Sequence, residues 1–448
     1  MIGLAVYSGV VAILLVGSIR RPAFALGAFL CMFGLEQWGA AKIGFVASNG
    51  SFTNYLAIVI VMIAFCVRLF KRSGWRLING PIHLLVILLY LYAALTLLWT
   101  PAYGPAMEEW RAQAPYLLFS VFFLPLLVQN SADAMEGLRG TIIPGAILAT
   151  ALAFLVQWGY RSIESDVPAG EAIQLPLAIA HLGAVVFVLA ILYFRWRGIS
   201  ALVALGLVTI SVILVVKTGS RGQLISMILS AMVFFPISRG WSFSRGAVIT
   251  LVGAGLALVA IWALLPDLST LVSAEQGRFD SERAVVDYEE RVEAVQRLFD
   301  VYASSGILGL LFGLGNSASF SPQILGFYTH IVPAEILCEL GVVGLMLFVT
   351  IWGMAARAML RFGTRLGSLQ VAAETRRSIA CLGAIAFIEL LLSFKEGSLV
   401  RDVNLFLFPI LIEGILASVA ARSLIKPTSR LLDDSTIQSR RPKASVRF

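Results

Sequence analysis

The chain has 448 residues, of which 59% are hydrophobic and only 13% are charged, with a formal net charge of +8. A typical soluble domain carries about 25% charged residues, so this chain has too little charge to cover two or three soluble domains. Apolar runs recur along it, and about 20 apolar residues span a bilayer as a helix. The composition therefore predicts an all-α polytopic membrane protein. It excludes a cytosolic enzyme, a disulfide scaffold and a disordered chain.

Hydropathy predicts a bundle of about 12–13 transmembrane helices. In chain order, the expected spans are 2–18, 22–38, 54–70, 80–99, 114–129, 141–158, 175–194, 199–216, 222–237, 246–265, 331–356, 379–394 and 404–421. The first span has no basic residues before it and is followed by Arg20 and Arg21, which is the reverse of a secretory signal. We therefore expect a retained first helix with its N-terminus outside.

The basic residues predict the orientation, because Lys and Arg collect in cytoplasmic connections. Most of the 34 Lys and Arg residues lie in alternate connections and in the tail. This places the segment 266–330 outside as one large periplasmic loop, with more acidic than basic residues. We expect the bundle to cover 1–421 and the basic tail 422–448 to be disordered, cytoplasmic and in contact with anionic lipids.

The same distribution excludes a nucleic-acid partner, because the cations form no basic patch on a folded face. The cysteines lie in apolar runs without a CxxC pair or a His/Cys cluster, so we expect neither a disulfide nor a metal site. They are Cys31, Cys66, Cys338 and Cys381.

A short outer turn, 217–222, is the first candidate site. Ser220 is expected to cap the helix that follows. A helix N-terminus flanked by Lys217 and Arg221 favours an anion, and an arginine can hold two phosphate oxygens at once. The alternative is that both cations simply extend to the membrane surface.

The second candidate is the segment 281–303, whose periodicity predicts an amphipathic helix in the outer loop. Arg291 points with its apolar side, and a cation there needs a partner. That partner is either a carboxylate such as Glu335 or an anionic ligand. The predicted apolar stripe consists of Tyr288, Val292, Val295, Phe299 and Tyr302.

Two further candidates follow in the chain. The glycines of 306–317 predict a tight turn or a close backbone approach in a re-entrant or packed loop, but their spacing fits no phosphate-binding loop. His330 precedes the next span, and histidine exchanges protons near neutral pH. Glu335 and Glu339 lie four residues apart on one helical face, where membrane carboxylates must be paired or hydrated.

The remaining titratable groups are expected to be structural. His83 and His181 lie at or inside spans, and Glu389 and Glu413 are expected to find partners within the bundle. Arg401, in the last outer loop, either contacts a phosphate or forms a surface ion pair.

These residues together resemble the O-antigen ligase and O-antigen polymerase superfamily of bacterial envelope glycosyltransferases. Arg221 lies in a Thr-Gly-Ser-Arg-Gly turn, and Arg291 lies in an outer helix followed by Gly-x-x-Gly and Gly-x-Gly. His330 is followed nine residues later by Glu339 and then by Gly-x-x-Gly. The resemblance is concentrated in residues 217–345.

The resemblance implies an inverting, metal-independent glycosyltransferase without a cofactor, in the bacterial inner membrane and with its active site on the periplasmic face. Its donor would be a glycan on undecaprenyl diphosphate, and its acceptor a growing glycan or lipid A-core. Arg221 and Arg291 would bind the diphosphate, His330 would position or deprotonate the acceptor hydroxyl, and Glu339 matches the family's following acid. Ile331 departs from the Asn or Ser often found there, which removes a polar contact beside the base.

The residue chemistry is consistent with this function, because a transferase outside the membrane has no ATP and needs a donor already activated on a lipid. Lys217, Ser220, Glu335, Glu339 and Arg401 are expected to support substrate binding. One alternative is a lipid-linked glycan flippase or another envelope transporter, with the acids in the spans as coupling residues. Another is a structural subunit beside polysaccharide assembly proteins.

Overall fold

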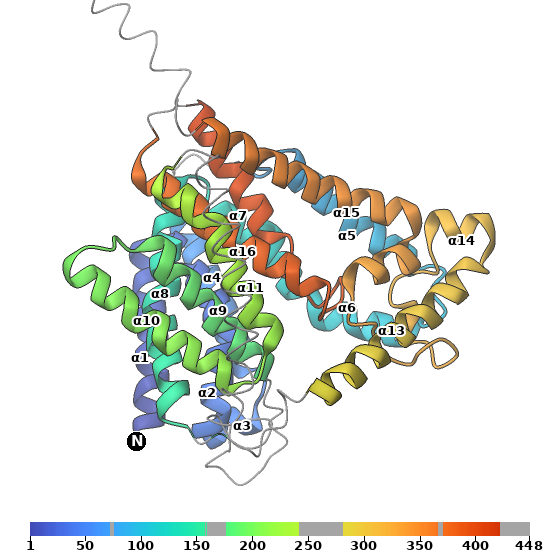
Figure 1. Cartoon of the computed structure of the whole chain (residues 1–448), viewed down its shortest axis with the longest axis horizontal. Coiled ribbons are helices and arrows are strands. Elements are labelled where there is room, and N and C mark those ends of the chain that lie inside the picture. Colours follow the sequence, from blue (N-terminus) through green and yellow to red (C-terminus); the bar gives the residue numbers. More distant parts are fainter. Residues whose placement is uncertain (72–75, 157, 159–175, 242–280, 366–370, 422–448) are drawn as a thin grey trace, which may run out of the picture.

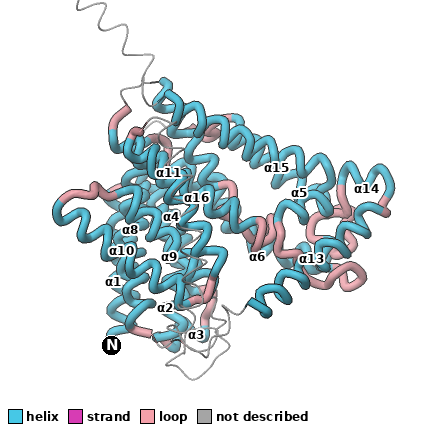
Figure 2. Tube along the Cα trace, viewed as in Figure 1, coloured by secondary structure: helices cyan, strands magenta, loops and turns pink. Residues whose placement is uncertain are grey.

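The structure, a computed structural model, describes residues 1–71, 76–156, 158, 176–241, 281–365 and 371–421, with side chains in the helix 281–303 described from residue 289 onward. Within these ranges the regular elements are helices, and none is a β-strand (Figures 1 and 2). The expected span 246–265, the loop residues 266–280 and the tail 422–448 lie outside the described residues.

The described helices form a polytopic membrane bundle. Eight of them are long and apolar enough to cross a membrane, and two shorter apolar helices, α5 (Pro81–Thr96) and Leu407–Ala421, accompany them. The eight are α1 (Ile2–Arg20), the 3-10 turn η1 (Pro22–Ala25) with α2 (Leu26–Lys42), α4 (Phe52–Phe70), α8 (Ser131–Phe154), α9 (Pro176–Tyr193), α10 (Gly198–Lys217), α11 (Arg221–Arg239) and α15 (Val332–Arg365).

Most of the other described elements connect and cover this bundle, whereas α16 (Ala373–Ser393) is largely buried and packs inside it against α11. Besides α16, these elements are α3 (Gly44–Ser48), α6 (Tyr103–Leu118), the π turn η2 (Phe119–Phe123), α7 (Leu124–Leu127), α13 (Ser281–Ala303), α14 (Gly306–Phe312) and the 3-10 turn η3 (Ala318–Phe320). The prediction of a helix over 281–303 is confirmed at both ends.

Three expected spans begin earlier in the structure than hydropathy indicated, and one of them, 379–394, belongs to α16, which starts at Ala373. The expected span 114–129 belongs to a helical stretch that already starts at Tyr103 and passes Pro115 and the π turn. The expected span 141–158 is the second half of α8. Asn130 starts this helix, because its Oδ1 accepts the N–H groups of Ala132 and Asp133 at 2.9 and 3.1 Å. Hydropathy misses these polar first turns.

Helix α2 forms the centre of the bundle. Together with η1 it is 89% buried, whereas the windows of α1 and α10 are 22% and 28% buried and present their apolar faces outward. Small residues permit its close contact with α8. A Cβ at Gly27 would lie 1.7 Å from the Gly140 carbonyl oxygen, and one at Gly140 would lie 2.2 Å from that of Phe24.

A second group of helices forms a side lobe beside this bundle. Figure 1 shows α13, α14 and the start of α15 at the right of the view, next to α5 and α6. Direct contacts join α13, α14 and α15 to one another, and join α15 to α5. The side lobe therefore combines the predicted outer loop with helices from the first third of the chain.

Helix α15 is broken at Gly341, whose φ of 68° and ψ of −169° are not helical. The break frees carbonyl groups, and the glycine-rich segment supplies their partners. Leu314 N–H donates to the Cys338 carbonyl at 3.0 Å, and Gly315 N–H donates to that of Glu339 at 2.9 Å. A Cβ at Gly313 would lie 2.1 Å from the Glu339 carbonyl oxygen, so the predicted close backbone approach is confirmed.

Candidate functional site

Helix α13 turns a different stripe toward the protein from the one predicted. Ala294, Leu298 and Tyr302 are buried, whereas Val292 and Phe299 are 41% and 45% exposed. The predicted stripe is therefore wrong for these two residues, because the helix packs through Ala294, Leu298 and Tyr302, which lie four residues apart on one face. The placement of Arg291 on the protein-facing side is confirmed, since it precedes Ala294 by almost one turn and is only partly exposed.

The hydrogen-bond partner of Arg291 is a backbone carbonyl. Its Nη1 donates to the Lys395 carbonyl oxygen at 2.8 Å, in the loop that follows α16. Glu335 is not its ion-pair partner in the described part of the chain; the Glu335 Oε1 accepts the Leu399 N–H at 3.0 Å instead. A carbonyl satisfies a donor but does not neutralise a guanidinium charge. Arg291 thus brings a positive charge to this end of the bundle.

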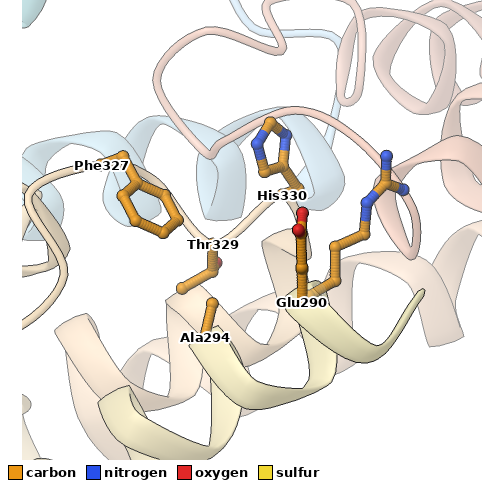
Figure 3. Close-up of a pocket in the computed structure, with 6 residues that line it drawn as sticks. Glu290, Ala294, Phe327, Thr329 and His330 are labelled. Carbon is orange, nitrogen blue, oxygen red and sulfur yellow. The ribbon is translucent and has the colours of Figure 1, made fainter. Parts of the chain in front are cut away.

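His330 and Arg291 line the same pocket, which has a volume of about 250 Å³. Its other lining residues are Glu290, Ala294, Phe327 and Thr329. Figure 3 shows the Glu290 side chain rising from α13 toward the imidazole of His330, with Phe327 on the other side of the cavity. Two residues that the sequence singled out 39 positions apart therefore meet at one cavity.

The backbone of His330 is left-handed, with φ of 63°. Such a conformation costs a non-glycine residue about 1–3 kcal/mol and persists only where the surroundings hold it. Burial lowers the pKa of His330, and the positive charges of Arg291 and Arg401 lower it further. The imidazole is therefore neutral at neutral pH and ready to accept a proton.

Arg401 reaches the same site from the last outer loop. Its Nε and Nη2 donate to the two carboxylate oxygens of Glu109 on α6, at 2.8 and 2.6 Å. Its guanidinium lies 4.7 Å from the centre of the Tyr328 ring, which in turn lies 4.1 Å from the centre of the His330 ring. Of the two predicted roles for Arg401, the structure contains the ion pair.

Glu335 and Glu339 lie on one face of α15, as predicted, but neither lines the pocket. Glu339 is fully buried and accepts the N–H groups of Ser317 and Ser319 at 2.5 and 3.0 Å. It thereby holds the glycine-rich segment against α15. Glu335 holds the loop before Arg401 through Leu399, and its Oε2 is buried without a hydrogen-bond partner among the described residues.

The turn 217–222 approaches the site from the bundle side. Ser220 occupies the N-cap position of α11 as predicted, yet its side chain makes no capping bond and its buried Oγ has no partner among the described residues. The Lys217 Nζ donates to the Ala153 carbonyl at 2.7 Å and thus contacts α8. A Cβ at Gly222 would lie 2.7 Å from the Lys395 Nζ. Lys395 therefore lies against the start of α11 while its carbonyl accepts from Arg291.

The other titratable groups take the structural roles expected of them. His181 Nε2 and Glu389 Oε1 lie 2.8 Å apart, linking α9 to α16. Glu413 accepts the N–H groups of Ile82 and His83 at 3.0 and 3.1 Å and so caps the first turn of α5. The acids in the late spans therefore have local partners, which weakens the transporter alternative.

Sequence reasoning missed four residues of the site. Phe327 and Tyr328 lie three and two positions before His330, and an aromatic pair this close to a candidate histidine was the available signal. Glu109 lies in the middle of α6, in a polar stretch between the expected spans 80–99 and 114–129. Glu290, which helical periodicity puts on the face opposite the predicted apolar stripe, lines the pocket.

Within the residues that the structure describes, no group of three or more His, Cys, Asp or Glu side chains could hold a metal ion. The pocket described above thus offers one arginine, one histidine and one carboxylate. Neither the protein-family models nor the curated proteins compared with this chain match it.

Proposed function

We propose that this membrane protein is a glycosyltransferase that moves a glycan from a lipid diphosphate to an acceptor hydroxyl. The observation that carries the proposal is the meeting of Arg291 and His330 at one pocket, from segments far apart in the sequence. The resemblance of residues 217–345 to the O-antigen ligase and polymerase superfamily supports it. The proposed location is the bacterial inner membrane, with the pocket on the periplasmic face and the C-terminus in the cytoplasm.

The cations would bind the donor diphosphate. Arg291 donates to the Lys395 carbonyl, and the Lys395 side chain lies against the first turn of α11, which begins at Arg221. A diphosphate at this place would meet positive charge from two helices. The unsatisfied Ser220 hydroxyl would add a donor to a phosphate oxygen. Fixed donors of this kind lower the barrier by about 2.7–4 kcal/mol each when they face the developing charge.

His330 would act as the general base. The acceptor oxygen attacks the anomeric carbon, its proton passes to the neutral imidazole, and the bond from that carbon to the diphosphate oxygen breaks with its electron pair. Attack opposite the leaving group inverts the anomeric centre. General base catalysis contributes roughly 10²- to 10⁴-fold. Glu290 and Phe327 in the same pocket suit the hydroxyls and the apolar face of a sugar.

A polymerase and a ligase differ in their acceptor, and one experiment distinguishes them. The purified protein is incubated with lipid-linked oligosaccharide, with and without lipid A-core, and the products are sized on a gel. A ladder that forms without core identifies a polymerase, and a single shift that needs core identifies a ligase. If a donor that serves a control enzyme gives no product here, a proteoliposome assay for lipid-linked sugar crossing the membrane becomes the next test.

The same assay tests the site. We expect Arg291→Lys to lower the transfer rate about 100-fold, since lysine keeps the charge but cannot make bidentate hydrogen bonds to a phosphate. His330→Ala should lower the rate at least as much. Arg297→Lys is the matched control, because Arg297 lies on the same helix, is 63% exposed and pairs with Glu293 at 2.6 Å. Full activity in both site variants would show that this assignment is wrong.

A further inference from the structure

An unbroken series of contacts connects helix α6 to the candidate base. Glu109 holds Arg401 through two hydrogen bonds of 2.8 and 2.6 Å. Arg401 lies over the Tyr328 ring at 4.7 Å, and the Tyr328 and His330 rings are 4.1 Å apart at an interplanar angle of 51°. The four residues come from three segments that are distant in the sequence.

Both the edge and the face of the Arg401 guanidinium are occupied. Its Nε edge meets the Glu109 carboxylate in the paired geometry that makes such bonds strong and directional. Its flat face lies over Tyr328 and, at 5.6 Å, over Phe320. The Glu109 side chain is only 10% exposed, so water weakens this pair less than it weakens a surface pair.

Helix α6 is itself anchored to the side lobe, which makes it a fixed support. The Trp110 Nε1 donates to the Asn316 Oδ1 at 2.7 Å, next to the glycine-rich segment. Trp110 therefore fixes α6 to the glycine-rich segment one position after Glu109, which bonds Arg401. His330 needs such support, because its left-handed backbone is strained and its ring is held mainly by its neighbours.

We propose that Glu109 and Arg401 form a positioning arm that fixes Tyr328 and, through it, the imidazole of His330. Arg401 is then a positioning residue and not a ligand of the diphosphate. The catalytic meaning of the arm rests on the proposed function. Its structural meaning does not, since the contacts exist without substrate.

Electrostatics support the arm. Burial and then Arg291 and Arg401 lower the pKa of His330, so an Arg401 held at this distance contributes to keeping the base neutral. The charged and titratable groups around His330 are Glu290 and Arg291 from α13, Arg401 from the last outer loop, Tyr328 from its own segment and, behind Arg401, Glu109 from α6.

The arm is tested by titrating His330 directly. The chain has only three histidines, so the full-length protein labelled in histidine gives few ring signals by NMR, and a His330→Gln variant assigns them. We expect His330 to titrate below about 6.5 in the wild type and to move upward in both Arg401→Gln and Glu109→Gln. The amide at position 109 cannot accept both hydrogen bonds of the Arg401 guanidinium, so we expect Arg401 to move away from the ring of Tyr328.

The control is Glu108→Gln, which removes the neighbouring carboxylate on α6, where the side chain is exposed. This variant should leave the His330 titration unchanged. If Glu109→Gln instead lowers the pKa of His330, or neither variant moves it, the arm is refuted. The first result would mean that Arg401 keeps its place without Glu109.

Transfer kinetics give the second readout. Glu109→Gln and Arg401→Gln should lower kcat about tenfold or more while the KM for the lipid-linked donor changes less than about twofold. Tyr328→Leu, which removes the aromatic ring between Arg401 and His330, should lower kcat in the same way. A donor KM that rises in Arg401→Gln with an unmoved His330 titration would make Arg401 a phosphate ligand and overturn the proposal. The expected titration in a protein that transfers no glycan would reject the proposed function and leave the arm standing.

Discussion

The imidazole of His330 lies where the side lobe meets the last outer loop, and its surroundings were only partly predictable. Helical periodicity placed Arg291 on the correct face of α13, because that pattern depends only on local spacing. The directions of the Tyr328 and Arg401 side chains could not be predicted, since irregular turns have no periodicity from which a side chain's direction follows. Glu109 could not be paired with Arg401 either, because 292 residues separate them.

A pH profile tests the state of the histidine. Because burial, Arg291 and Arg401 lower the pKa of His330, its neutral base form persists to more acidic pH than in a free histidine. We expect kcat/KM for glycan transfer to fall only below about pH 6.5 as the free enzyme is protonated. Thermal unfolding at each pH checks that the protein stays folded. A fall that begins well above pH 6.5 would contradict a neutral, desolvated base.

At the scale of elements, hydropathy located most helices of the bundle but not their functional interruptions. The spans of α1, α4, α9 and α10 were predicted within a few residues, because each is apolar throughout. The break in α15 was missed. Gly341 lies in an otherwise apolar run, and only its backbone contact with the distant glycine-rich segment makes the break necessary.

Because of this break, adding one methyl group at position 341 should strongly lower the stability of the protein. The φ and ψ of Gly341 belong to a region that is almost restricted to glycine, and a Cβ there would lie 2.3 Å from the Leu311 carbonyl oxygen. We expect Gly341→Ala to destabilise the protein by more than about 2 kcal/mol and to lower its Tm in detergent.

Gly353→Ala in the same helix is the control for this effect. No atom lies within 4 Å of a Cβ at that position, and alanine is the better helix former by about 0.5–1 kcal/mol. Its Tm should stay the same or rise slightly. Equal Tm values for the two variants would mean that the break at Gly341 does not bear on stability.

At the scale of the whole molecule, the basic connections predicted to be cytoplasmic and the candidate site lie at opposite ends of the helices. Contacts between distant segments tie together the connections predicted to be cytoplasmic. Arg68 pairs with Asp133 at 3.0 Å, and Arg377 donates to the Tyr193 carbonyl at 3.0 Å. The candidate site gathers the connections predicted to be outside, around α13 and the loop after α16. Charge alone predicts an orientation, whereas the convergence of these connections at one site follows only from the fold.

The opposite ends of α15 and the side lobe make the proposed orientation testable. Ser304 follows α13 and Thr364 ends α15, and both side chains are exposed. In intact spheroplasts, a membrane-impermeant maleimide should label Ser304→Cys and leave Thr364→Cys unlabelled until the membrane is opened, because the positive-inside rule puts the basic end of α15 in the cytoplasm. Cys66 is the exposed native thiol of the described part, so Cys66→Ser provides the background. Labelling of Thr364→Cys alone would show that the orientation is the reverse of the one proposed. It would also contradict the proposed function, since the pocket of Arg291 and His330 would then face the cytoplasm and not the periplasm.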